Sequence, residues 1–543
     1  MSSKLEAIKQ LDTVGIAIAL VLGGLALASG YAALHFGWFR SPWELAVWLV
    51  VCVAFLVIGL PSQSGTQATI ALSKWATRAD IEQAGIDENP SRPLKVGEEG
   101  IYLGFFADKV SALTLRYFGK KHLLGFGPPG ANKSTGLFVT NLAHLRRSII
   151  VLDPKGELAA ITARAREKFG RVIVLNPFDE LTDKAPHLKS EGWNPLRQLD
   201  KSSPDFGDDA LCIADAIIEG SGDGKDKFFY ESAKNLTQAL LMWEVITHGK
   251  EAKLTNLTTL LTVDLVGTLK AMSKSENKIV QETGQALSDQ KADKNSKSET
   301  IDNIVATIRS NINFLYDERI GADMWFGRAT PSGDFRKADA IPFENFHKSI
   351  TTVYLILPLE EIADKAKWMR IFVNLALRKL YKSSPKYEAA LPPVMFMLDE
   401  FGNLGRLQEI IRAMTTARGK RVQLFMLMQT LGQLKEHYAN EWTNFFAGAG
   451  AVTTFKTGDT ETAEQFGKIY GNREESVPTL TATGVSNTPH AIPLIRPEDI
   501  GRLRQGEVIS SIEPCNMPVK GSAPIYPETR FADGLDANPY FHG

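Results

Sequence analysis

The chain has 543 residues, of which 44% are hydrophobic and 23% are charged. This composition excludes a largely disordered protein, and the length favours two or three domains over a single core. The formal net charge of -1 excludes the overall basic footprint of a small nucleic-acid-binding domain, so any contacts with phosphates have to be local.

Two apolar runs near the N-terminus predict a membrane anchor. Residues 14–34 carry no charge, and about 20 apolar residues cross the hydrocarbon core of a bilayer as a helix. Residues 45–60 form a second run, and Trp43 and Trp48 bring rings that favour the membrane interface. We expect a two-helix transmembrane hairpin within residues 1–60, with the lipid bilayer as a partner. The alternatives are a cleaved signal peptide and a buried helical hairpin.

Basic residues on both sides of this hairpin predict its orientation. Lys4 and Lys9 precede the first run, and Lys74 and Arg78 follow the second. Because cytoplasmic flanks of membrane helices are enriched in Lys and Arg, we expect the large domain to be cytoplasmic.

A short apolar strand, a glycine-containing turn and an apolar helical pattern follow one another over residues 122–145. The turn at residues 127–135 matches the GxxxxGK[ST] loop, in which backbone N–H groups surround phosphates, the lysine reaches the terminal phosphates and the hydroxyl holds Mg²⁺. The sequence therefore predicts a site for ATP and Mg²⁺. The expected nucleotide contacts are Gly127, Gly130, Asn132, Lys133, Ser134 and Thr135, with Ser134 also a metal ligand.

Asn132 stands where the loop pattern has its second glycine. Asn tolerates positive φ better than most residues, so the loop can keep its shape at a cost of about 1 kcal/mol. We expect nucleotide binding to be retained, whereas the rate of hydrolysis depends on this position. Taken alone, the segment is also compatible with an ordinary glycine-rich turn.

A continuous apolar run over residues 394–398 ends at Asp399 and Glu400. Such a run is typical of a buried parallel strand, and carboxylates at its C-terminal end emerge where α/β sheets bind ligands. The pair therefore fits a Walker B motif, with Asp399 near Mg²⁺ and Glu400 polarising the attacking water. The alternative is a solvated turn or a helix N-cap.

Two further polar residues are candidates for catalysis. Arg418 follows a helical pattern over residues 407–416 and is either an arginine finger supplied to a neighbouring subunit or a surface salt-bridge partner. Gln429 follows an apolar strand over residues 422–428 and either senses the γ-phosphate or only ends the strand.

These motifs, with several others, resemble the coupling proteins of conjugative and type IV secretion systems, the TraG and TrwB-like family. The further motifs are Asp-Pro-Lys-Gly-Glu at residues 153–157, Trp-Asn-Pro-Leu at 193–196, Phe-Gly at 401–402 and Arg-Pro-Glu-Asp at 496–499. Their order along the chain is that of the family. We interpret the segment at 153–157 as diagnostic of the family and not as catalytic.

The resemblance implies an α/β fold with a RecA-like P-loop motor domain, a mainly parallel sheet, an inserted all-α domain and the two-helix anchor. The expected segments are the anchor (1–60), a juxtamembrane linker with the start of the motor (61–100), the first part of the motor (101–195), the all-α domain (196–335) and the second part of the motor (336–543). Helical patterns over 210–218, 228–246 and 300–314 favour the all-α assignment. Residues 472–495, rich in Thr, Ser, Asn and Pro, are expected to form a mobile loop.

The resemblance also implies a membrane-anchored ATPase of the bacterial inner membrane that delivers substrates to the secretion channel. The implied partners are the channel components of the inner membrane, a relaxase–DNA complex or effector proteins with adaptors, and further copies of the chain in a homo-hexamer with nucleotide between neighbours. Two alternatives stay open, a nucleotide-binding scaffold that does not hydrolyse ATP and a chromosome-segregation-type translocase of double-stranded DNA.

Overall fold

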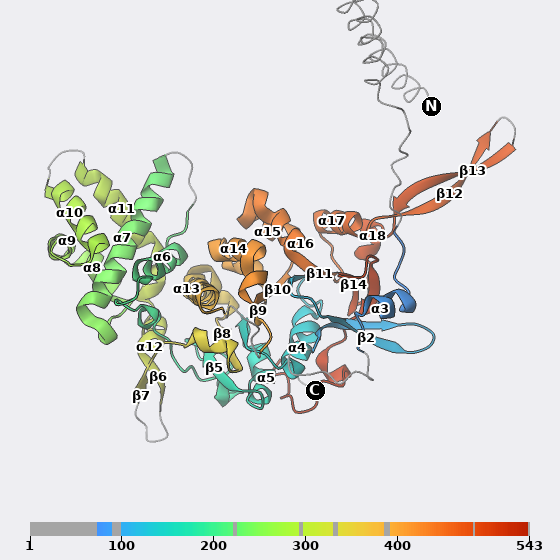
Figure 1. Ribbon diagram of the computed structural model, residues 1–543, viewed down its shortest axis with the longest axis horizontal. Helices are drawn as coiled ribbons and strands as arrows, with labels where there is room; N and C mark the ends of the chain where they lie inside the picture. Colours follow the sequence, from blue (N-terminus) through green and yellow to red (C-terminus); the bar gives the residue numbers. More distant parts are fainter. Residues whose placement is uncertain are drawn as a thin grey trace, which may run out of the picture. The chain divides into compact units, whose positions relative to one another are not determined.

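The computed structural model describes residues 73–88, 99–220, 225–292, 297–329, 335–384, 391–481 and 484–540 (Figure 1). The predicted transmembrane hairpin of residues 1–60 lies outside these ranges. Within them, no helix combines the length and the apolar character needed to cross a bilayer. Residues Ala71–Gly543 form one compact unit.

An eleven-stranded mixed sheet is the centre of this unit. Seven neighbouring strands are parallel, and in spatial order they are β11 (Ala449–Thr454), β3 (His122–Phe126), β10 (Val422–Met428), β9 (Val394–Leu398), β4 (Ile149–Asp153), β8 (Thr351–Ile356) and β5 (Arg171–Leu175). The other four pair antiparallel beyond β11, in the order β14 (Glu507–Ile512), β15 (Val519–Ser522), β1 (Ile101–Ala107) and β2 (Ala112–Tyr117). The parallel strands bring their carboxyl ends to one edge, which is where such sheets bind ligands.

Both faces of the sheet are buried, which explains why its parallel strands are mostly apolar. Leu124 and Phe126 of β3 belong to one core and Leu123 to the other, as the alternation of side chains along a strand requires. Helices on the second face are α3 (Arg78–Ala84), α4 (Val139–His144) and α5 (Glu157–Arg166). Helices on the first face are α13 (Leu359–Ser383), α14 (Gln408–Thr416), α15 (Leu431–Tyr438), α16 (Trp442–Gly448), α17 (Thr460–Tyr470) and α18 (Pro497–Ile500).

Between β5 and β8 lies a segment that is helical over most of its length. Its helices are α6 (Phe206–Ile217), α7 (Lys225–His248), α8 (Asn256–Thr262), α9 (Leu265–Met272), α10 (Lys278–Ala292), α11 (Lys297–Asn311) and α12 (Glu318–Trp325). A short hairpin follows, β6 (Phe326–Ala329) with β7 (Phe335–Lys337). The predicted helix at 228–246 is confirmed within α7, and those at 210–218 and 300–314 are confirmed for the residues that lie within α6 and α11.

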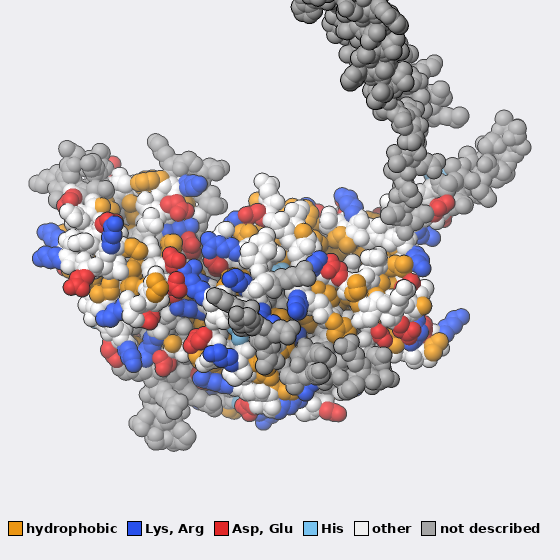
Figure 2. Space-filling model, in the orientation of Figure 1, with side chains coloured by type: hydrophobic (Ala, Val, Ile, Leu, Met, Phe, Trp, Pro, Cys, Tyr) orange, Lys and Arg blue, Asp and Glu red, His pale blue; other side chains and the backbone are white. Residues whose placement is uncertain are grey.

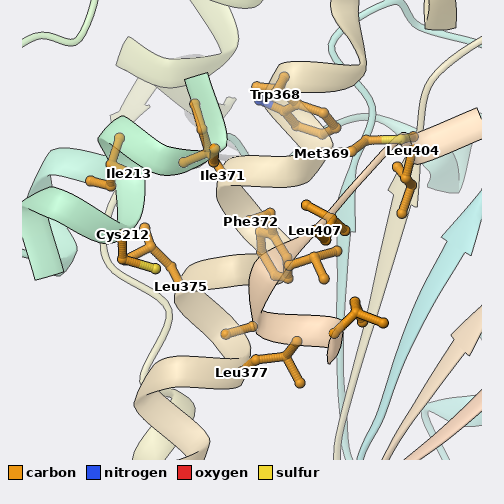
Figure 3. Packing of buried hydrophobic residues seen from close by; sticks show 14 of the residues in the cluster. Cys212, Ile213, Trp368, Met369, Ile371, Phe372, Leu375, Leu377, Leu404 and Leu407 are labelled. Carbon is orange, nitrogen blue, oxygen red and sulfur yellow. The ribbon is translucent and has the colours of Figure 1, made fainter. Parts of the chain in front are cut away.

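Helix α13 connects this helical segment to the sheet. Figure 3 shows Cys212 and Ile213 of α6 beside Ile371 and Leu375 of α13, all in one continuous buried core. Ion pairs of Asp209 in α6 with Arg378 and Lys379 in α13 add to this apolar packing, so α13 is closely packed against the helical segment.

The structure corrects two expectations. Residues predicted as a mobile loop form a long antiparallel hairpin, β12 (Asn472–Thr481) with β13 (Gly484–Pro493) (Figure 1). The segment lacks the apolar alternation by which a strand is recognised, although its Thr and Val residues favour strands. Within the predicted linker of residues 61–100, the helix α3 was missed despite a capping box between Thr77 and Asp80.

Candidate functional site

The glycine-containing turn leads from β3 into a helix at the carboxyl edge of the sheet. A π-helical turn, η1 (Ser134–Phe138), precedes α4. Gly130 has φ 76° and Asn132 has φ 62°, so both adopt the left-handed conformation. The positive φ predicted for Asn132 is therefore confirmed, and its conformation carries a strain of the order of 1 kcal/mol that glycine would lack.

The Lys133 side chain is folded over the turn. Its Nζ donates hydrogen bonds to the carbonyl oxygens of Gly127 at 2.6 Å and Pro128 at 3.1 Å, and lies 4.0 Å from Oε1 of Glu400. Burial lowers the pKa of Lys133, while the charges of Glu400 and Asp399 oppose that effect. The ammonium group is thus held beside both the phosphate-binding turn and the acidic strand.

The two predicted motifs meet in space although 265 residues separate them. The Ser134 hydroxyl donates a hydrogen bond of 2.7 Å to Oδ2 of Asp399. The sheet order explains the meeting, because β3 and β9 flank β10 and all three run parallel. A serine hydroxyl beside a carboxylate is the oxygen donor set that Mg²⁺ prefers.

The acidic pair has an unusual environment. Burial raises the pKa of Asp399 to about 6, with a further contribution from the charge of Glu400, while the hydrogen bond from Ser134 lowers it. Glu400 adopts φ 50°, a strained conformation for a non-glycine residue. A bound cation beside Asp399 would favour its ionised form.

Gln429 holds the second carboxylate in place. Its Nε2 donates a hydrogen bond of 2.8 Å to Oε2 of Glu400. The backbone N–H of Gln429 in turn donates to Oε1 of Gln433 on α15 at 3.0 Å. Gln429, which directly follows β10, therefore places a polar side chain between the ends of β3 and β9, because β10 lies between these two strands.

Five of the predicted site residues are thus brought together, namely Lys133, Ser134, Asp399, Glu400 and Gln429. Thr135 is buried in η1. Arg418 belongs to the short helix η8 (Ala417–Lys420), and its side chain lies outside what the structure describes.

Two residues near the site were not predicted as part of it: Asp153, which the sequence marks only as the first residue of a family motif, and Gln433. Asp153 ends β4, the strand beside β9, and burial raises its pKa to about 8. Its Oδ2 accepts a hydrogen bond of 2.8 Å from the backbone N–H of Ala159 in α5. The other missed residue is Gln433. An acidic residue at the end of a neighbouring parallel strand was the available signal for Asp153, whereas nothing in the sequence marked Gln433.

The turn also has the close packing that a phosphate cradle requires. A Cβ atom on Gly127 would lie 2.8 Å from Cβ of Phe455, so a side chain cannot be accommodated there without movement. Gly127 donates its backbone N–H to the carbonyl oxygen of Met428 at 3.1 Å, which ties the turn to β10. The residues present therefore fit a nucleotide phosphate chain with Mg²⁺.

A parallel sheet with a phosphate-binding turn on one strand and paired carboxylates two strands away defines the class of P-loop nucleotide-binding proteins. The model of one family within this class, described as type IV secretory system conjugative DNA transfer, matches residues 70–535. This chain belongs to that family, which confirms the resemblance found in the sequence.

Proteins with similar sequences include a conjugal transfer protein TraG and a protein VirD4. The chain is 23% identical to a conjugal transfer protein TraG of Escherichia coli over 464 residues, which cover 79% of this chain and 71% of that protein. It is 25% identical to the protein VirD4 of Agrobacterium fabrum over 422 residues, which cover 73% of this chain and 58% of that protein.

Solved structures of the conjugative coupling protein TrwB share the fold. A trigonal form in complex with sulphate covers 83% of this chain and 94% of its own, with a TM-score of 0.58 at 15% identity. The complex of TrwB with ADP and Mg²⁺ gives the same coverage, with a TM-score of 0.56 at 14% identity. At this identity the likeness establishes the mixed α/β fold with its large, mostly parallel sheet.

Proposed function

We propose that this protein is a membrane-anchored ATPase that couples substrates of a bacterial conjugation or type IV secretion system to its channel. The described residues form the motor together with a mainly helical domain inserted over residues 196–335, which is not all-α as predicted because it includes the strand β6, and residues 1–60 form the transmembrane hairpin. ATP with Mg²⁺ supplies the energy. The complexes of the relative TrwB with ADP and Mg²⁺ and with an ATP analogue support this choice of cofactor.

Each residue of the site has its own role in ATP hydrolysis. Lys133 neutralises the terminal phosphates, and backbone N–H groups of the turn donate to the phosphate oxygens. Ser134 and Asp399 hold Mg²⁺ between them. Glu400 accepts a proton from the attacking water, and Gln429 keeps this carboxylate oriented through its hydrogen bond.

The observation that carries the proposal is the hydrogen bond between Ser134 and Asp399, because it joins two motifs that the chain keeps far apart. We expect ATP turnover by the wild-type protein and its loss in Lys133→Ala, because the phosphates lose their only cation on the turn. Steady-state phosphate release, with and without single-stranded DNA, measures this. Lys109→Ala, on an exposed loop, is the control and should keep full turnover.

A second candidate function is a receptor in which nucleotide binding sets the conformation without turnover. Asn132 favours it, because its side chain stands in the phosphate-binding turn where a glycine is usual. If the wild-type protein binds ATP tightly but does not hydrolyse it, the receptor function is supported and the motor function is excluded.

The proposed function also includes a membrane anchor and several partners. The large domain faces the cytoplasm beneath the inner membrane, in a homo-hexamer that contacts channel components and recruits either a relaxase–DNA complex or effectors with adaptors. Affinity purification of the full-length protein from its own membrane, followed by mass spectrometry, tests this. Recovery of a relaxase indicates DNA cargo, and recovery of an adaptor without a relaxase indicates protein cargo.

A further inference from the structure

A large cleft separates the helical segment from the sheet region on the side opposite α5. It has a volume of about 810 Å³ and is lined by residues of α6, α7, α13, α14 and α15 and by the chain between β9 and α14. Figure 2 shows charged side chains gathered where α6 and α7 meet α14. The volume is in the range of cavities that hold nucleotide-sized ligands.

The floor of the cleft contains a buried acceptor. Asn374 on α13 is 2% exposed and lines the cleft, and its Oδ1 has no hydrogen-bond partner among the described residues. A buried amide oxygen without a hydrogen-bond partner has an unfavourable desolvation cost. A ligand with an N–H donor would remove this cost.

Cations from both sides form the rim of the cleft. Lys227 comes from α7, while Arg406 and Arg412 come from the chain after β9. Arg406 pairs with Glu441 at 2.7 Å and Arg412 with Glu409 at 2.6 Å. The arginine side chains are 37% and 58% exposed, so both can reach a phosphate, and the Arg406 pair, whose Glu441 is also exposed, is the weaker one because Glu409 is buried.

The carboxylates of the cleft are already paired. Asp215 and Glu231 contact Lys234 at 3.2 and 3.4 Å, and Glu219 contacts Arg370. Lys234 and Arg370 thus face three carboxylates, and with the rim cations the residues that line the cleft include five cations against three carboxylates, an excess of positive charge.

An aromatic ring stands in the wall of the cleft. Tyr230 packs closely on Gly220, where a Cβ atom would lie 2.2 Å from the ring. Close packing on Gly220 restrains the ring, and nucleic-acid bases stack favourably on tyrosine rings.

We propose that this cleft binds a nucleotide unit, with its phosphate on Lys227, Arg406 and Arg412 and an N–H edge of its base on Asn374. The cleft shares no residue with the P-loop site. Single-stranded DNA, the cargo in the proposed function, and a free mononucleotide both present this chemistry. In the first case the inference rests on that function.

Binding of a labelled single-stranded oligodeoxynucleotide to the full-length protein in detergent, followed by fluorescence anisotropy, tests the cleft. We expect Lys227→Glu and Arg412→Glu each to weaken binding about tenfold and to lower the slope of log affinity against log salt by about one per lost contact. Lys278→Glu makes the same charge change on the exposed surface of α10, and should weaken binding far less. Turnover of ATP without DNA should be unchanged in all three.

A second arm separates the two sources. In the Lys133→Ala background, which removes the P-loop lysine, binding of a labelled mononucleotide is measured with and without the rim substitutions. Loss of oligodeoxynucleotide binding alone identifies a DNA strand as the occupant, and loss of mononucleotide binding identifies a free nucleotide. If rim variants bind both probes as the control does, the proposal is wrong, whatever the result for ATP turnover.

Discussion

Asn132 adopts a conformation for which glycine is better suited, at the point where the turn approaches the phosphates. We expect Asn132→Gly to keep ATP turnover or to raise it, because the substitution removes about 1 kcal/mol of backbone strain and a side chain beside the nucleotide. Measuring ATP turnover and ATP affinity of the wild-type protein and the Asn132→Gly variant at the same Mg²⁺ concentration checks this.

Asn132→Ala is the matched comparison. It removes the amide but keeps a Cβ at positive φ, so strain alone should make it less stable than the glycine variant. A complete loss of turnover in Asn132→Gly would contradict the expectation and would mean that the asparagine amide itself has a role in catalysis.

At the residue scale, the sequence predicted those members of the site that carry a motif. Lys133 and Ser134 follow from one local pattern, and Asp399 and Glu400 from another. The bond of Gln429 to Glu400 needed the sheet order, which places β10 between the two motif strands. Motifs report local chemistry, whereas contacts between distant residues depend on strand order, which no local pattern encodes.

Among the elements, the helix after the phosphate-binding turn depends on a close approach at Gly136. A Cβ atom there would lie 2.8 Å from the carbonyl oxygen of Ala523, just after β15. The backbone of Ala523 cannot move like a side chain, so we expect Gly136→Ala to destabilise the protein by about 1–3 kcal/mol and to weaken ATP binding by displacing η1. Thermal melting with and without ATP measures both effects.

Gly432→Ala is the control for this element. Gly432 lies in α15, and a Cβ atom there would meet only the Thr430 hydroxyl at 3.5 Å. Because alanine favours helices, stability should be unchanged or up to about 1 kcal/mol higher. Equal melting temperatures for Gly136→Ala and wild type would show that η1 and β15 are not rigidly packed.

The apolar strands were the elements best predicted. β9 and β10 agree with their predicted bounds, and β3 begins at residue 122 as predicted, because a strand buried on both faces reads as one apolar run. The hairpin of β12 and β13 was mistaken for a loop, since its strands are too polar to show a pattern. The four antiparallel strands at the edge of the sheet form two local hairpins, β1 with β2 and β14 with β15, and the pairing of β1 with β15 that joins the hairpins spans most of the chain.

At the scale of the whole molecule, the proposed hexamer makes a prediction about Arg418. In a ring with identical head-to-tail interfaces, a site between neighbours takes residues from two subunits. If Arg418 acts in the neighbour's site, an Arg418→Ala subunit still supplies Glu400, and a Glu400→Gln subunit still supplies Arg418. Each variant alone should lose about 10²-fold or more in turnover.

Mixed rings of these two variants should regain activity, because some interfaces combine the intact Glu400 of one subunit with the intact Arg418 of the next. With equal amounts and random assembly, about a quarter of the interfaces are complete, so turnover should rise towards a quarter of the wild-type rate. Mixing Arg418→Ala with the double variant forms no complete interface and should stay inactive. If the two single variants also stay inactive after verified co-assembly, Arg418 acts within its own subunit or only pairs with a surface carboxylate, and a finger across the interface is excluded.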